Sequence, residues 1–162
     1  MMAKIEARLA ELGLVLPPPL KLPPGVTLPF PWVRVHGDRA YISGHVPQNN
    51  DGSLAGPFGK VGGDVSLEEA QSAACLTALA MLASLKRELG DLDRVTDWLR
   101  VFGMVNSAPG FDQQPQVING FTDLIVDVYG YDHGQHARSA VGMAELPFGL
   151  AVELEAEVAI ET

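Results

Sequence analysis

The 162-residue chain contains a single cysteine, Cys75, and therefore cannot form an internal disulfide bond. A protein without disulfides fits a reducing compartment, so we expect a cytoplasmic location. No stretch approaches the roughly 18 uninterrupted apolar residues that a membrane-spanning helix needs. The first residues, from Met1 to Glu6, lead into an amphipathic helix and lack the pattern of a signal peptide. The sequence thus predicts no contact with a membrane.

Basic residues are also scarce: 11 lysines and arginines stand against 20 acidic residues, which gives a formal charge of −9. A nucleic-acid-binding protein normally carries a cationic surface that displaces counterions from phosphates. We therefore expect no nucleic-acid partner. A small anionic ligand remains compatible with this charge, because one well-placed arginine can hold a carboxylate.

Motifs for nucleotides and metals are missing as well. The glycine-rich loop around Gly62 and Gly63 matches neither a P-loop nor a dinucleotide fingerprint, so no nucleotide cofactor is expected. His133 and His136 are close enough in sequence to suggest a metal pair, but no third ligand follows at a plausible spacing. We interpret them as polar loop residues beside Arg138 and expect no metal.

What the chain does contain is a globular composition, with 47% hydrophobic and 19% charged residues. Apolar residues at helical spacing occupy residues 3–12, and a proline-rich stretch follows over residues 16–25. We interpret residues 1–29 as an N-terminal extension made of this helix and an extended connector. Residues 30–162 are then the domain proper, which is long enough for one sizeable core.

The domain predicts an α+β fold. A capping box, in which Ser66 is the N-cap and Glu69 the third helical residue, begins a long helix that ends at Gly90. Periodicity predicts a second helix and five strands, so that the element order is ββαβαββ. Right-handed crossovers would place both helices on one face of a mixed sheet. The expected strands are residues 32–35, 40–44, 96–105, 138–146 and 150–160, and the second helix is residues 113–129.

The residue pattern of the third strand predicts that the face of the sheet away from the helices is also covered. Its alternate positions place Trp98, Phe102 and Met104 on one side and Leu99, Val101 and Val105 on the other, so both sides are apolar. An exposed sheet face of this kind is unfavourable in water. We expect neighbouring subunits to cover it in a closed ring. A monomer with an apolar patch is the alternative.

Three segments of the sequence resemble the RidA/YjgF family. The first runs from Ala137-Arg138-Ser139 through a Leu-Pro turn into Val152-Glu153-Leu154-Glu155-Ala156. The second is Ile42-Ser43-Gly44-His45-Val46-Pro47, and the third is Ile118-Asn119-Gly120-Phe121. The resemblance extends from Trp32 to the C-terminus. It implies a chorismate-mutase-like fold and a trimeric barrel with a ligand cleft at each subunit interface.

The resemblance also implies roles for two charged residues. Arg138 would anchor the carboxylate of a small metabolite, since a guanidinium can donate two parallel hydrogen bonds to it. A surface or structural ion pair is the alternative for this residue. Glu153 would orient the water that attacks the substrate. Its alternative is a solvated strand face, which Glu153 would share with Glu155 and Glu157.

Further binding residues follow from the same resemblance. Ser43 and Gly44 would contact the ligand through hydroxyl and backbone groups, and Ala140 would offer its backbone N–H to the carboxylate. Asn119 could contact the ligand or only satisfy the helix N-terminal region. An aromatic residue of the first hairpin would close the pocket, and packing in the core is an equally good interpretation of the two candidates, Phe30 and Trp32.

The function implied is hydrolytic deamination of reactive enamines or imines, such as 2-aminoacrylate, to a 2-keto acid and ammonia. A protein that binds a keto acid or similar metabolite without turnover is the alternative. A ribonuclease or translation inhibitor is a third, which the acidic composition disfavours. His45 stands where the family commonly has glutamine, and residues 106–119 diverge, so we expect a related subgroup.

Overall fold

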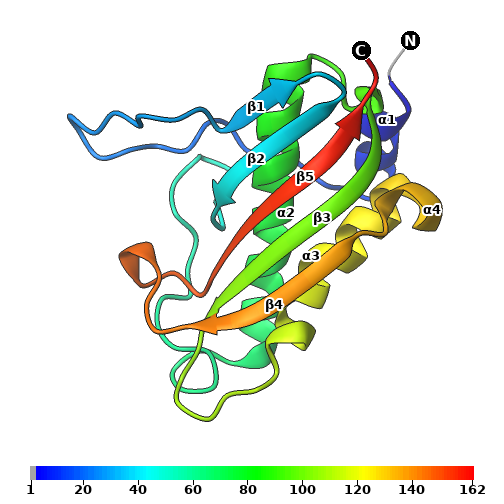
Figure 1. Ribbon diagram of the computed structural model, residues 1–162. Coiled ribbons are helices and arrows are strands. Elements are labelled where there is room, and N and C mark those ends of the chain that lie inside the picture. The colour runs from blue at the N-terminus through cyan, green and yellow to red at the C-terminus, as the bar shows by residue number, and fades with distance from the viewer. Residues whose placement is uncertain (1–2) are drawn as a thin grey trace.

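The computed structural model describes residues 3–162, and in it a five-stranded sheet is covered on one face by two long helices (Figure 1). The predicted ββαβαββ order is confirmed, with shorter helices added to it. The strands are β1 (Val33–His36), β2 (Arg39–His45), β3 (Val95–Asn106), β4 (Ala137–Met143) and β5 (Val152–Ile160). The helices are α1 (Lys4–Glu11), α2 (Leu67–Leu89), α3 (Gln114–Tyr129) and α4 (Tyr131–Gly134), and the 3-10 turns are η1 (Leu92–Arg94) and η2 (Pro147–Gly149).

The sheet is mixed, as predicted, and its strands follow the order β1-β2-β5-β3-β4. Only the β3–β4 pair is parallel among the described strands, and α3 makes the crossover between them. The C-terminal strand β5 therefore lies in the middle of the sheet, whereas β4, which carries Arg138, is an edge strand. An edge strand has one side free for a ligand or another chain.

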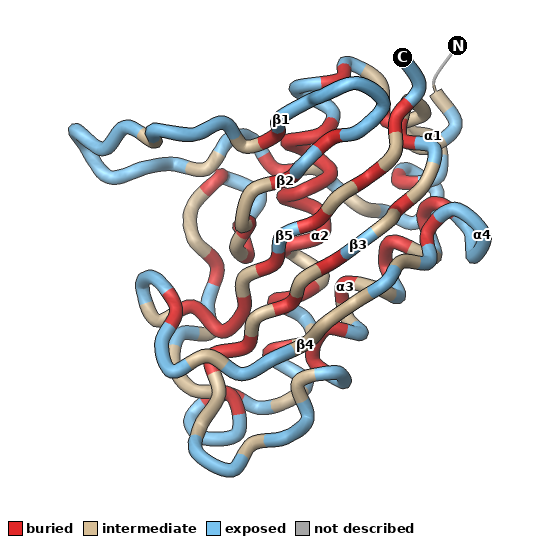
Figure 2. The backbone as a smooth tube through the Cα atoms, viewed as in Figure 1, coloured by how far each residue is buried: buried red, intermediate tan, exposed pale blue. Residues whose placement is uncertain are grey.

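The core lies between the sheet and the helices α2 and α3 (Figure 2). The predicted capping box begins α2, because the Ser66 hydroxyl accepts from Glu69 N at 3.1 Å and the Glu69 carboxylate accepts from Ser66 N at 2.8 Å. Along β5, Val152, Leu154 and the apolar residues that follow at every second position are buried against the helices. The residues between them, beginning with Glu153, therefore point to the opposite face.

That opposite face is not covered by any element of residues 3–162. It exposes Tyr41 of β2 and presents Phe102 and Met104 of β3, which are only half-buried. One prediction for β3 is wrong: Trp98 does not share this face, but is buried on the helix side. The register of β3 against β5 shifts between Trp98 and Arg100, and such a bulge reverses the alternation of side chains.

The N-terminal extension packs onto the domain instead of standing apart from it. Pro17 is buried, and the carbonyl oxygen of Pro18 accepts from the Gln48 side chain at 3.2 Å. Further along, Lys21 N donates to Gly52 O at 2.9 Å. The connector is thereby attached to the loop that follows β2. Residues 1 and 2 lie outside the described part of the chain. Within that part, no helix has the length and apolar character needed to cross a membrane.

Candidate functional site

Arg138 is held against α3 by three hydrogen bonds. Its Nη1 donates to Asn119 Oδ1 at 2.9 Å and to Thr122 Oγ1 at 3.0 Å, and its Nη2 donates to the carbonyl oxygen of Pro115 at 3.3 Å. Asn119 and Thr122 are three residues apart, so both lie on the side of α3 that meets the edge strand. The guanidinium is therefore fixed in direction although it lies near the surface. We call Arg138, Asn119 and Thr122 the anchor.

The guanidinium still has donors to offer. A guanidinium carries five N–H groups, and the three bonds of the anchor leave Nε–H and one Nη2–H without an acceptor among residues 3–162. No carboxylate oxygen of these residues lies within 4.0 Å of it either, so the ion pair considered above does not form within the chain. Burial lowers the pKa of Arg138, which the Asp123 carboxylate partly offsets. The side chain nevertheless stays charged at physiological pH.

Glu153 lies elsewhere, on the uncovered face of the sheet. It lines a cleft of about 480 Å³ that we call the Glu153 cleft. One wall comes from the extended segment before β1, drawn in blue in Figure 1, and another from the η2 turn between β4 and β5. The lining is largely apolar and includes Leu22, Val26, Phe30, Trp32, Gly44 and Phe148 besides Glu153.

Glycine at position 44 makes room for the Glu153 carboxylate. A Cβ atom at Gly44 would collide with Glu153 Oε1, so any other residue there would displace the carboxylate. Burial, and second the Glu155 carboxylate, raise the pKa of Glu153. No hydrogen bond or ion pair to its carboxylate is formed within the described residues. A half-buried carboxylate of this kind can both accept and return a proton.

Ser43 and His45 flank Gly44 and bond to the protein itself. The Ser43 hydroxyl donates to Pro31 O at 2.8 Å, which holds the extended segment in place. The His45 ring lies 5.0 Å from the Trp32 ring, and its Nδ1 donates to Ser43 O at 2.6 Å. Its Nε2 accepts from the Ser84 hydroxyl at 2.8 Å. His45 thus supports one side of the Glu153 cleft from behind.

Comparison with known proteins agrees with this geometry. Residues 6–152 match the family described as "YjgF/chorismate_mutase-like, putative endoribonuclease". The chain belongs to the YjgF/RidA family. It is 38% identical over 157 residues to Protein TCP17 of Trypanosoma cruzi, covering 96% of this chain and 93% of the other. It is 41% identical to Atu1372 of Agrobacterium tumefaciens, a protein of unknown function, with a TM-score of 0.86 and coverage of 98% and 93%.

The family fold extends to more distant proteins. RidA from an Antarctic Psychrobacter has 20% sequence identity and a TM-score of 0.56, and the match covers 85% of this chain and 93% of that one. At this level of identity the likeness concerns the fold. The expected YjgF/chorismate-mutase-like architecture is therefore confirmed for the single chain.

The structure divides the eight predicted site residues of this YjgF/RidA chain into two groups. Arg138 and Asn119 meet in the anchor, and Ala140 lies two residues beyond Arg138 on the same strand, paired with Gly103 of β3. The other group lines the Glu153 cleft and comprises Glu153, Gly44, Phe30 and Trp32. Ser43 adjoins this second group, but its hydroxyl proton is donated to Pro31 O.

Two features of the site were not foreseen. Thr122 belongs to the anchor, and its helical spacing from Asn119 was a usable signal. The apolar wall supplied by the extended segment was the other, and no local pattern could have placed it there. Phe148 of η2 also lines the cleft, with a backbone φ of 59°, a conformation uncommon for a residue other than glycine.

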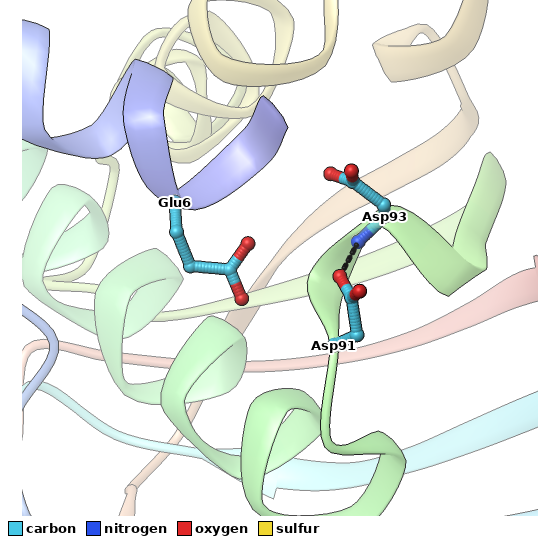
Figure 3. A group of neighbouring side chains, drawn as sticks. All are labelled: Glu6, Asp91 and Asp93. Atoms are coloured by element: carbon cyan, nitrogen blue, oxygen red, sulfur yellow. Dashed lines mark hydrogen bonds between the residues drawn. The ribbon is translucent and has the colours of Figure 1, made fainter. Parts of the chain in front are cut away.

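An acidic group attaches the N-terminal helix. Glu6 of α1, Asp91 and Asp93 place carboxylate oxygens within 4.8 Å of one another, a spacing that could hold a cation (Figure 3). Asp93 accepts from the first two backbone N–H groups of α1 at 2.9 and 2.8 Å, and Asp91 accepts from Asp93 N at 2.8 Å. Glu6 Oε1 accepts from Leu92 N at 3.3 Å, while Glu6 Oε2 is buried without a hydrogen-bond partner among the described residues. We interpret the group as a helix cap that joins α1 to the domain.

The buried His45 predicts a pH-dependent stability. Burial lowers the pKa of His45 from 6.5 to about 4, more than the bond to Ser43 O raises it. Between pH 6.5 and about 4, the His45 ring binds a proton in the unfolded chain but stays neutral in the folded protein. The neutral ring therefore contributes to the free energy of unfolding fully above pH 6.5, and this contribution is lost as the pH falls toward 4. The total loss is on the order of 3 kcal/mol.

We expect His45→Gln to flatten the fall in the free energy of unfolding across this pH range, as measured by urea denaturation from pH 7.5 to 4. His36→Gln, at an exposed position of the same hairpin, is the matched control. Parallel curves for the wild type and His45→Gln would show that the ring is not buried in its neutral form.

Proposed function

We propose that this protein hydrolyses 2-imino acids and their enamine tautomers to 2-keto acids and ammonia. The observation that supports this most is the unpaired but fully oriented guanidinium of Arg138. Three bonds to α3 prevent it from turning away, and no carboxylate of residues 3–162 neutralises it. A charged and oriented donor of this kind is well placed to bind a ligand that carries a carboxylate.

The remaining donors of Arg138 suit a carboxylate in geometry as well as charge. Nε–H and an Nη2–H lie on one edge of the guanidinium plane and can donate two parallel bonds to the two oxygens of a carboxylate. Such charge-assisted bonds are about twice as strong as neutral ones. The edge of β4 remains open beside them, where the backbone of Ala140 could add a further donor.

Glu153 would direct the chemistry at the imine carbon. Its carboxylate accepts a proton from a water molecule as the water oxygen forms a bond to C2 and the C=N electron pair moves to nitrogen. The protonated Glu153, which its raised pKa favours, then returns the proton to the nitrogen. Glu153 then accepts the proton of the C2 hydroxyl and passes it to the nitrogen of the carbinolamine. The C–N bond breaks, ammonia leaves with the electron pair of that bond, and the C2–oxygen double bond of the 2-keto acid forms.

A single chain does not assemble this site, and we propose that neighbouring subunits in a homotrimer do. Arg138 pairs with Val101, whereas Glu153 pairs with Met104, so the two residues are on different strands either side of β3. Two strand spacings amount to about 10 Å. Arg138 also turns toward α3, while Glu153 points to the uncovered face. A small metabolite cannot reach both residues of one chain.

Two other functions are compatible with parts of this site. A protein that only binds a keto acid would need the anchor but would not need a raised pKa at Glu153. The raised pKa of Glu153 therefore favours the catalytic function over binding alone. A ribonuclease would need cationic groups along a phosphate backbone, and the charge of −9 disfavours it. We further place the protein in the cytoplasm, where the free Cys75 thiol, half-buried and bonded to Gly120 O, would stay reduced.

The enzymatic proposal predicts separate losses for the two residues. In a coupled assay, a pyridoxal-phosphate dehydratase produces the imine from threonine, and release of 2-oxobutanoate is followed. Arg138→Ala should lower kcat/KM by at least about 100-fold, because a charge-assisted anchor is lost. Glu153→Gln should lower kcat by about 100-fold or more and leave KM nearly unchanged.

Arg34→Ala, which removes an exposed arginine of β1, is the matched control and should retain full activity. Rates for the wild type equal to those in buffer would contradict the enzymatic proposal. If the wild type then still gained thermal stability from 2-oxobutanoate and Arg138→Ala did not, the function would be binding alone.

The assembly can be tested through the uncovered face. Phe102 of β3 is half-buried there and lies opposite Glu155 of β5. A glutamate at position 102 would place an unpaired charge in the proposed interface and would also repel Glu155. Light scattering should give three times the chain mass for the wild type and less for Phe102→Glu. Val15→Glu, on the exposed connector, should stay trimeric. A wild type that has the mass of one chain at micromolar concentration would contradict the trimer.

A further inference from the structure

Arg138 is the first member of a chain of hydrogen bonds that continues into the protein. Its Nη1 donates to Thr122 Oγ1 at 3.0 Å, and Thr122 Oγ1 lies 3.0 Å from Nε2 of His136. The other ring nitrogen of His136, Nδ1, lies 2.8 Å from the carbonyl oxygen of Gly134. These contacts connect the edge strand, α3 and the end of α4.

The groups at the two ends of this series of hydrogen bonds, Gly134 O and the Arg138 guanidinium, determine where each proton lies. A carbonyl oxygen only accepts, so Nδ1 of His136 carries a proton and donates to Gly134 O. Nε2 of the neutral ring must then accept, and the Thr122 hydroxyl donates to it. The Thr122 oxygen consequently turns its lone pairs toward Arg138, whose N–H groups can only donate. Only in this arrangement does the donor of each of these three hydrogen bonds have an acceptor.

We propose that Thr122 and His136 are positioning residues for Arg138, and that uptake of a proton by the His136 ring weakens carboxylate binding. This inference rests on the proposed role of Arg138. With a proton on both nitrogens, Nε2 would donate to Thr122, and the hydroxyl proton would lose its acceptor. The positive charge of the His136 ring would also repel the Arg138 guanidinium and disturb the orientation of the guanidinium against α3.

The surroundings of the ring favour the neutral form at neutral pH. The side chain is partly buried, with the Phe121 ring 6.3 Å away, and burial lowers the pKa of His136 more than the bond to Gly134 O raises it. The charged group that acts on the ring is Arg138 of β4, which lowers the pKa further. Asp123 of α3 acts on Arg138, while Asp132 of α4 acts on His133. No carboxylate of the described residues offsets the effect on His136 itself.

The same arrangement occurs a second time, away from the anchor. Arg87 Nη2 donates to Ser84 Oγ at 3.0 Å, the Ser84 hydroxyl donates to His45 Nε2 at 2.8 Å, and His45 Nδ1 donates to Ser43 O at 2.6 Å. There the arginine continues to Pro17 O and supports the fold. A neutral histidine that orders a hydroxyl beside an arginine thus occurs twice in the described residues. The copy at Arg138 is the one that the proposed function places beside a ligand.

The proposal can be tested by calorimetric titration with 2-oxobutanoate between pH 8 and 5, where the ligand carboxylate stays ionised. The wild type should bind less tightly as the pH falls. His136→Gln keeps a neutral side chain and should lose this pH step. Thr122→Val should weaken binding by about ten-fold or more at pH 8, the loss expected for one hydrogen bond to a charged group. Thr122→Ser keeps the hydroxyl and should retain both the affinity and the pH step.

His133→Gln is the matched control, because His133 is exposed and pairs with Asp97 at 3.0 Å outside the chain of bonds. It should have the pH profile of the wild type. The proposal is overturned if His136→Gln keeps the wild-type pH step, or if Thr122→Val binds as tightly as Thr122→Ser.

A ligand-free measurement separates this proposal from the proposed function. Long-range 1H–15N NMR spectra of the histidine rings should show the Nδ1–H tautomer for His136 at pH 8. The Nε2–H tautomer would contradict the chain of bonds whatever the protein binds. Absence of 2-oxobutanoate binding together with the Nδ1–H tautomer would instead contradict the role of Arg138, and the positioning proposal with it.

Discussion

The central constraint is that one sheet is covered by helices on a single face. Arg138 turns from the edge strand toward these helices and is held by α3, whereas Glu153 turns from the middle of the sheet to the uncovered face. The two charged groups that the proposed reaction needs are therefore kept apart within the chain. The same constraint leaves Phe102 and Met104 uncovered by the described part of the chain. In the proposed trimer, another subunit would cover them.

Keeping the groups apart has an electrostatic consequence. If the Arg138 guanidinium and the Glu153 carboxylate were in direct contact, they would form an ion pair, and a ligand carboxylate would have to displace it. Among residues 3–162, Arg138 has only neutral acceptors. These are the Asn119 and Thr122 side chains and a carbonyl oxygen, which orient the guanidinium without neutralising it. Glu153, in turn, lies among apolar side chains that raise its pKa. Under the proposed function, both groups are therefore free to act on a bound imine.

Much of this could be predicted from the sequence because the decisive signals are local. The capping box at Ser66 and the alternation of β5 placed α2 and the direction of Glu153 correctly. Separate sequence segments indicate Asn119 and Arg138 as site residues, and the order of α3 and β4 along the chain brings them together. The bulge beside Trp98 was missed, because an extra residue in a strand leaves no mark on composition or periodicity. The sequence predicts only a connector for the extended segment, whereas its apolar residues form a wall of the Glu153 cleft through contacts far along the chain.

The most direct test of the account mixes two inactive variants. Arg138→Ala keeps Glu153, and Glu153→Gln keeps Arg138, so a subunit of each kind can together form one intact site. After joint refolding at equal amounts, random trimers should regain roughly a quarter of the wild-type imine hydrolysis, because one interface in four would combine the two intact residues. Mixtures that stay as inactive as either variant alone, while exchange of subunits is verified by mass spectrometry, would contradict a site shared between chains.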